Sequence, residues 1–198
     1  MKAIDHGDRN SKKIALTFDD GPNPFWTPKI LALLDKSGIK GNFFVLGKWA
    51  RLYPAIVKDM YRQGHLIGNH GYSHSKDTAD FGACEDVLRS ITGEKVNFIR
   101  PPYLNAGLCA GYGPAESSFA KIINTDVFPH DYKHTAQEIV DFVLNHTVNG
   151  SIILLHDGSQ RETDLENRPA EMFASLPEII MNLRNKFVFS RLDEMELE

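Results

Sequence analysis

Short apolar runs rich in β-branched and aromatic residues alternate along the chain with longer amphipathic stretches. Seven such runs occur, at Ile14 to Phe18, Gly41 to Leu46, His65 to Gly68, Asn97 to Arg100, Ala120 to Asn124, Ser151 to Leu155 and Phe187 to Ser190. Each run is almost continuously hydrophobic, which is typical of strands covered on both faces in a parallel sheet. The pattern therefore predicts about seven buried parallel strands.

Four amphipathic stretches between these runs predict helices. They are Pro28 to Lys36, Pro54 to Gln63, Thr135 to Asn145 and Pro169 to Asn185, and Gly38 and Gly64 follow the first two as stop signals. The segments Ala106 to Pro114 and Asp157 to Arg168 are rich in turn-forming residues and are predicted to be loops. Strands that alternate with helices predict an α/β fold made of βαβ units.

The length and charge of the chain limit what it can do. Its 198 residues fall within the usual range of one domain, so residues 1–198 are expected to form a single domain. A net charge of -4 argues against broad attraction to nucleic acid or to anionic lipid. The sequence also lacks the run of apolar residues that a membrane-spanning helix needs. Oligomeric state is left open.

The first fifteen positions are polar and carry no signal-peptide core, which leaves two compartments open. The chain is expected to be cytoplasmic, or to be the mature part of an exported protein without its leader. The two cysteines, Cys84 and Cys109, are expected to be small buried hydrophobic residues, and a single disulfide between them is the alternative.

Polar and charged residues follow several of the predicted strands. In parallel α/β folds the loops beyond the carboxyl ends of the strands carry the function, so these residues are expected to share one rim. They are Asp19 and Asp20, His70 and His74, Arg100 and Tyr103, Asp131, and His156.

The pair His70 and His74 is the first candidate for metal binding. A spacing of four places two imidazoles on one side of a helical turn, within reach of one cation. A carboxylate from Asp19 or Asp20 would complete a three-ligand site with an open position. The alternative is that the histidines line a loop and that the adjacent carboxylates occupy a solvated turn.

Four segments, in this order, resemble the polysaccharide deacetylases of carbohydrate esterase family four, also called the NodB homology domain. They are Thr17 to Pro22 (TFDDGP), His70 to His74 (HGYSH), Arg100 to Tyr103 (RPPY) and Leu154 to His156 (LLH). The likeness spans most of the chain and implies a distorted (β/α) barrel of about seven strands, in agreement with the strand count. Two positions depart from the family pattern: Asp131 is followed by Tyr132 where the family commonly has Trp, and Leu104 stands where many relatives carry Gly.

The resemblance implies a role for each candidate residue. Asp20, His70 and His74 would hold a divalent cation, with zinc as the first expectation and cobalt or nickel as substitutes. Asp19 would act as general base and His156 as general acid. Arg100 would pair with Asp19, and Asp131 would orient His156 or Arg100.

The same resemblance implies the substrate contacts. The main-chain N–H of Tyr103 would stabilise the oxyanion, and Leu154 would line a pocket for the acetyl methyl group, although core packing explains Leu154 equally well. Aromatic residues Trp26, Tyr72 and Tyr132 are expected to pack in the ordinary way and are not assigned to the site.

The implied activity is hydrolytic removal of acetyl groups from carbohydrate that contains N-acetylglucosamine, either chitin oligomers or peptidoglycan, with a metal-bound water as nucleophile. Removal of O-acetyl groups from acetylated xylan is one alternative. A catalytically silent carbohydrate-binding module is another.

Overall fold

A curled parallel sheet forms the centre of the computed structural model, which describes residues 3–75, 79–109 and 120–198. Its strand order is β5-β4-β3-β2-β1-β6, with β7 also paired to β1, and every pairing between these strands is parallel. The strands are β1 (Lys13–Gly21), β2 (Asn42–Val45), β3 (Leu66–Asn69), β4 (Phe98–Ile99), β5 (Lys121–Ile122), β6 (Ile152–His156) and β7 (Val188–Phe189). Each strand overlaps one of the seven predicted runs.

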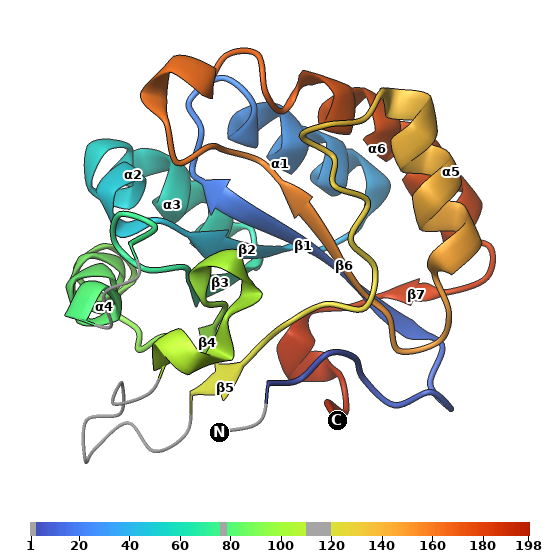
Figure 1. Cartoon of the computed structure of the whole chain (residues 1–198), viewed down its shortest axis with the longest axis horizontal. Coiled ribbons are helices and arrows are strands. Elements are labelled where there is room, and N and C mark those ends of the chain that lie inside the picture. The colour runs from blue at the N-terminus through green and yellow to red at the C-terminus, as the bar shows by residue number, and fades with distance from the viewer. Residues whose placement is uncertain (1–2, 76–78, 110–119) are drawn as a thin grey trace.

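Helices cover the outer side of this sheet, so the fold is a distorted (β/α) barrel and the predicted fold class is confirmed (Figure 1). They are α1 (Thr27–Ser37), α2 (Gly47–Leu52), α3 (Pro54–Arg62), α4 (Ala79–Thr92), α5 (Ala136–His146) and α6 (Ala170–Leu183). The four predicted helices correspond to α1, α3, α5 and α6. The start of α5 is fixed by a capping box, in which Thr135 and Glu138 each accept from the other's backbone N–H.

Two helices were not expected from the sequence, α2 and α4. Helix α4 buries Phe81, Cys84 and Leu88 at helical spacing, but Gly82 and several acidic residues interrupt the apolar pattern between them. A narrow apolar face of this kind gives a weak periodic signal. Both predicted loops contain short 3-10 turns, at Ala106–Cys109 and Glu162–Asp164, and residues 110–114 of the first loop lie outside the described part.

The alternation of side chains along β1 separates the core from the site. Ile14, Leu16 and Phe18 point outward and pack among the helices in the main hydrophobic core. The intervening residues Thr17 and Asp19 therefore face the interior of the barrel, because successive side chains of a strand point to opposite faces. Truncation of Phe18 to alanine would cost about 3–5 kcal/mol of stability, the usual range for a buried aromatic residue.

Both cysteines are buried and neither forms a disulfide, as expected for small hydrophobic residues. Helices long and apolar enough to cross a membrane are absent from the described residues. The described residues near the two ends of the chain lie side by side, with Gly7 bridged to Leu197.

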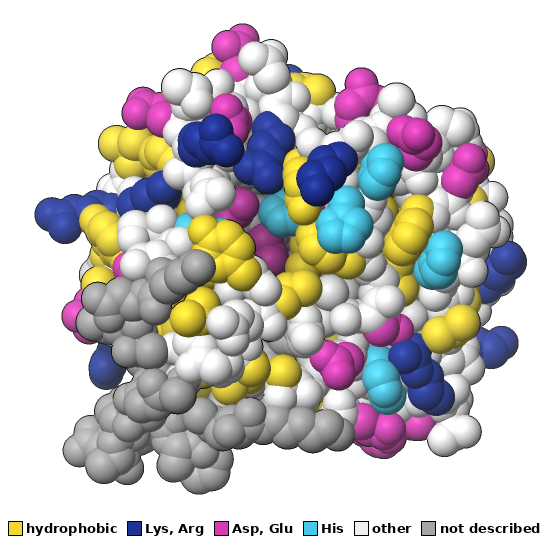
Figure 2. Space-filling view, viewed as in Figure 1, with side chains coloured by type: hydrophobic (Ala, Val, Ile, Leu, Met, Phe, Trp, Pro, Cys, Tyr) yellow, Lys and Arg dark blue, Asp and Glu magenta, His cyan; other side chains and the backbone are white. Residues whose placement is uncertain are grey.

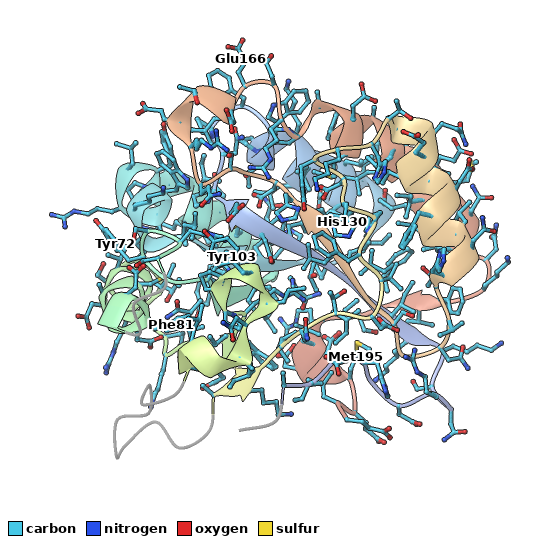
Figure 3. The ribbon with its side chains drawn as sticks, in the orientation of Figure 1. Tyr72, Phe81, Tyr103, His130, Glu166 and Met195 are labelled. Carbon is cyan, nitrogen blue, oxygen red and sulfur yellow. The ribbon has the colours of Figure 1, made fainter. Side chains whose placement is uncertain are left out.

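One face of the molecule is hollowed near its centre. Figure 2 shows acidic and histidine side chains at the floor of this hollow and lysine and arginine side chains along one side of it. Tyr103 and His130 lie on opposite sides of it in the stick view of the same face (Figure 3). This hollow contains the candidate site.

Candidate metal centre and active site

The two adjacent carboxylates at the end of β1 line the same cavity, although a regular strand would point them to opposite faces. The pairing of β1 with β2 explains this: Asp19 is opposite Phe44 and Gly21 is opposite Val45, so Asp20 is skipped. Asp20 also has a left-handed backbone, with φ of 70°. This irregularity turns the Asp20 side chain toward the cavity, as β-bulges next to functional sites commonly do.

The segment from His70 to His74 is a bent loop after β3, so the predicted helical turn is wrong. Left-handed backbone at Gly71 and His74, with φ of 84° and 64°, prevents a helical turn. The loop instead wraps around the Asp80 carboxylate, which accepts hydrogen bonds from the backbone N–H groups of Tyr72, Ser73 and Ser75. The two imidazoles still meet, with ring centroids 5.1 Å apart.

Three potential ligand atoms converge at Asp20. Its Oδ1 lies 3.5 Å from Nε2 of His70 and 3.6 Å from Nε2 of His74. Two ligand atoms about 2.1 Å from a tetrahedral ion are about 3.4 Å apart, so these separations fit a zinc-sized cation. Asp20 Oδ1 is buried and has no hydrogen-bond partner, which is expected of an oxygen that coordinates a cation. Of the two carboxylates considered from the sequence, Asp20 is the one grouped with both histidines.

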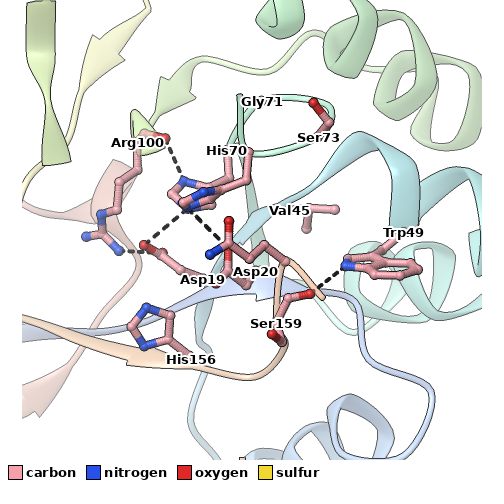
Figure 4. A network of polar contacts seen from close by, with 12 residues as sticks. Asp19, Asp20, Val45, Trp49, His70, Gly71, Ser73, Arg100, His156 and Ser159 are labelled. Carbon is pink, nitrogen blue, oxygen red and sulfur yellow. Dashed lines mark hydrogen bonds and ion pairs between the residues drawn. The ribbon is translucent and has the colours of Figure 1, made fainter. Parts of the chain in front are cut away.

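The protonation states of this group suit ligation. The Nδ1 of His70 donates to the backbone carbonyl of Arg100 at 2.7 Å, which leaves the Nε2 lone pair facing Asp20 (Figure 4). Burial, together with the neighbouring His70, lowers the pKa of His74 to about 4. Burial alone would raise the pKa of Asp20, but the facing histidines outweigh it and the net pKa lies below the ordinary value. A neutral imidazole and an ionised carboxylate are the forms that bind a metal.

Asp19 lies on one side of the group and is held by Arg100, which is fully buried. Arg100 donates through Nη1 to Asp19 Oδ1 at 2.8 Å and to Thr17 Oγ1 at 2.7 Å, and through Nη2 to the carbonyl of Asn124 at 2.9 Å. The other oxygen of Asp19, Oδ2, lies 3.8 Å from His70 Nε2. The ion pair expected between Asp19 and Arg100 is therefore present, and it leaves one carboxylate oxygen directed at the ligand group.

His156 lies across the cavity, at the end of β6 and opposite Asp19 in the strand register. The Asp131 carboxylate accepts from both its backbone N–H and its Nδ1, each at 2.8 Å. Burial by itself lowers the pKa of His156, but Asp131 outweighs it and raises the pKa to about 9. Of the two expected partners of Asp131, the structure pairs it with His156.

These groups line a cavity of about 350 Å³. Leu154 is 1% exposed and forms part of its wall. Tyr103 is 59% exposed, and its ring lies 4.6 Å from that of His74. Tyr103 and Leu104 both have left-handed backbone, with φ of 59° and 56°. A left-handed conformation at residue 104 explains why glycine suits this position, so Leu104 occupies it with strain.

Sequence reasoning missed several residues of this cavity. Phe128, Gln160 and Arg168 line it, and so does Tyr132, which was expected only to pack. The ring of Tyr132 lies 5.5 Å from that of His156, edge on. All four come from loops, where no periodic pattern marks a residue as pointing inward. Trp26 agrees with the expectation, because it packs on Phe173 instead.

Asp157, next to His156, is a further buried carboxyl that the sequence did not single out. It accepts a short hydrogen bond from the Thr27 hydroxyl. Burial raises its pKa to about 7, against the opposing effect of that hydrogen bond. It contacts the Gly21 backbone position, where any side chain would collide with it. Asp157 therefore supports the turn that carries Asp19 and Asp20.

Sequence comparison identifies relatives over most of this chain. The model of the polysaccharide deacetylase family matches residues 6–107. A peptidoglycan-N-acetylglucosamine deacetylase of Bacillus cereus is 38% identical over 159 residues, which cover 76% of this chain and 58% of that protein. This chain thus spans little more than half the length of that relative. A chitooligosaccharide deacetylase of Sinorhizobium fredii is 32% identical, over 80% of this chain and 78% of its own.

Solved structures agree with the sequence matches. The crystal structure of a peptidoglycan N-acetylglucosamine deacetylase in complex with 4-naphthalen-1-yl-N-oxidanyl-benzamide has a TM-score of 0.85 and 33% identity, and the match covers 96% of this chain and 91% of that one. A family 4 acetyl xylan esterase from Clostridium thermocellum, in complex with a cobalt ion, has a TM-score of 0.77 and 30% identity, with 92% and 89% covered. The family predicted from the motifs is confirmed: this chain belongs to the polysaccharide deacetylases of carbohydrate esterase family four.

Proposed function

We propose that this chain is a metal-dependent deacetylase that hydrolyses the acetamide of N-acetylglucosamine units in a glycan. One observation carries the proposal: the ligand group of Asp20, His70 and His74 is flanked by Asp19 on one side and by His156 on the other, inside one cavity. Each flanking residue has its own buried partner, Arg100 or Asp131. A metal site alone needs neither pair, whereas amide hydrolysis needs both a base and an acid.

Asp20, His70 and His74 would hold the cation. A divalent ion bound there would supply Lewis-acid chemistry, which would polarise the acetyl carbonyl and make a water molecule easier to deprotonate. Zinc suits a site with two nitrogen ligands, one oxygen ligand and an open position. Cobalt is a reasonable substitute, since the related acetyl xylan esterase contains that ion.

Asp19 would act as the base. Its Oδ2 faces the ligand group while its Oδ1 is fixed by Arg100, so only one oxygen is left to accept a proton from an attacking water. The guanidinium of Arg100 favours the ionised carboxylate, which is the form that can accept it.

His156 would act as the acid. Its Nδ1 is held by Asp131, so its Nε2 is the nitrogen that can donate to the leaving amine. A pKa of about 9 keeps this proton in place at neutral pH. An amine is a poor leaving group until it is protonated, so the acid matters more for an amide than for an ester.

Two further contacts would fix the acetyl group. Leu154 offers a small apolar wall for the methyl, and the main-chain N–H of Tyr103 would stabilise the oxyanion. A preference for acetyl over larger acyl groups would rest on this wall.

Cleavage of O-acetyl groups on xylan is a second candidate, favoured by the 30% identical acetyl xylan esterase. The variant His156→Ala separates the two activities. If both use this site, the variant should lose amide cleavage by at least about a hundredfold and retain most ester cleavage.

The test is acetate release by the zinc-loaded chain from N-acetylglucosamine oligomers and, in parallel, from acetylated xylan oligomers. Release from the amino-sugar oligomers supports the proposal. Release from acetylated xylan alone would favour the esterase. No release from either, with zinc, cobalt or nickel, would leave a silent carbohydrate-binding module as the better account.

A further inference from the structure

Arg168 lies where the cavity of the candidate site joins a second cavity. The second cavity has a volume of about 610 Å³ and is lined largely by polar residues of the loop after His156. Three residues line both cavities: Tyr132, Gln160 and Arg168. The second cavity gives a glycan chain with one sugar at Asp19 and His156 room for its next sugar beside Arg168.

The guanidinium of Arg168 is held in place without an acidic partner. Its Nη1 donates to Ser159 Oγ at 3.1 Å, and its carbon atom Cζ lies 4.8 Å from the centroid of the Tyr132 ring. Within the described ranges, no carboxylate oxygen lies within ion-pair distance of it. Stacking on an aromatic ring orients the planar guanidinium and leaves most of its N–H groups available as hydrogen-bond donors.

The acidic residues around the second cavity are already engaged. Asp131 pairs with His156, and Asp164 lies 3.8 Å from Arg161 Nε. Glu171 accepts from the backbone N–H of Ala136 at 2.7 Å. None of these three carboxylates therefore pairs with Arg168.

Positive charge is concentrated on this side of the hollow, although the chain as a whole carries -4 (Figure 2). Lys133 lies near the same aromatic ring as Arg168, with its Nζ 5.3 Å from the Tyr132 centroid. Arg168 lines the same cavity as Asp20, His70 and His74. An anion at Arg168 would thus lie close to the sugar under attack.

We propose that Arg168 binds a carboxylate on the glycan unit next to the N-acetyl sugar that is hydrolysed, so that the substrate is an acidic glycan and not neutral chitin. This inference rests on the proposed function. A guanidinium fork can bind a carboxylate through two parallel hydrogen bonds, which a neutral sugar cannot provide. In peptidoglycan this carboxylate has two sources: the lactyl group of muramic acid, and the acidic stem peptide attached to it.

The test compares kcat and KM for acetate release from three oligomers of equal length. The first alternates N-acetylglucosamine with muramic acid that carries a free lactyl group, the second carries stem peptides, and the third is neutral chitin. The wild-type chain should prefer one of the two acidic oligomers over chitin by about tenfold. Arg168→Gln should raise KM for that oligomer about tenfold and remove the preference, whereas Arg184→Gln should preserve it. Arg184 is a matched control because it is exposed at the other end of α6.

If the wild-type and Arg168→Gln chains preferred the acidic oligomer over chitin to the same degree, the inference would be overturned. An equal fall in kcat on all three oligomers in Arg168→Gln would also overturn it, because Arg168 would then act in the reaction itself. Binding to the Asp19→Asn chain separates this inference from the proposed function. If no oligomer is hydrolysed but Arg168→Gln weakens binding of the acidic oligomer about tenfold in that background, only the proposed function fails. Binding that is unaffected by Arg168→Gln would overturn the inference independently of hydrolysis.

Discussion

The carboxylate of Asp131 accepts two hydrogen bonds from His156, one from its backbone N–H and one from its Nδ1, each 2.8 Å long. The first fixes where the end of β6 lies, and the second fixes which ring nitrogen faces the cavity. We propose that Asp131 acts on the reaction through His156, as a positioning residue.

Asp131→Asn should shift the alkaline limb of the kcat profile to lower pH. In the folded chain burial lowers the pKa of His156, and Asp131 more than reverses this, to about 9. The imidazole is protonated below its pKa, so the wild-type acid is lost only as pH rises through about 9. Without the Asp131 carboxylate, burial still lowers the pKa and only the smaller effects of Asp20 and Asp19 oppose it, so the limb should move to a pH well below 9. A pH profile of acetate release measures this, and a limb that stays in place would show that another group sets it.

Asp19→Asn should reduce kcat by about 10² to 10⁴, the usual contribution of a general base, and leave cation binding nearly intact. Asparagine keeps an oxygen that can accept from Arg100 but cannot take up a proton. Zinc content and acetate release should be measured on the same preparation. If the variant lost its zinc together with its activity, Asp19 would be a ligand and not the base.

Arg100→Met should destabilise the chain by about 3–5 kcal/mol, because it leaves the buried Asp19 carboxylate without its counter-charge. Arg100 is 0% exposed and makes three side-chain hydrogen bonds, so solvent cannot replace it. Urea unfolding of the metal-free chain gives the free energy directly. The double variant Arg100→Met with Asp19→Asn should recover part of the loss, and no recovery would show that the cost comes from packing.

The sequence predicted the sheet well because buried parallel strands produce continuous apolar runs, as in β2 and β6, where nearly every residue is buried. It did not predict α4, whose buried residues are few and separated by polar ones. Strands β4 and β5 have two residues each and lie within longer predicted runs. The predicted runs are longer because the apolar residues continue beyond the residues that pair with a neighbouring strand.

The candidate residues of the site were recognised from spacing and motif, but their geometry was not. In a regular strand, where successive side chains alternate between the two faces, Asp19 and Asp20 would point to opposite sides of the sheet. Both enter one cavity because Asp20 is skipped in the pairing of β1 with β2 and has a positive φ. The helical turn assigned to His70 and His74 was wrong because the Asp80 carboxylate organises the loop from a later helix. Arg168 and Phe128 carry no local signal, since their position depends on how distant loops pack.

A cation at Asp20, His70 and His74 should be required for deacetylation, and one titration tests this requirement most directly. The chain is treated with a chelator, dialysed, and assayed for acetate release from N-acetylglucosamine oligomers as zinc is added. We predict that activity falls to background without metal and returns in full at one equivalent, while Asp20→Asn does not respond. Full activity in the metal-free chain, confirmed by elemental analysis, would contradict the account.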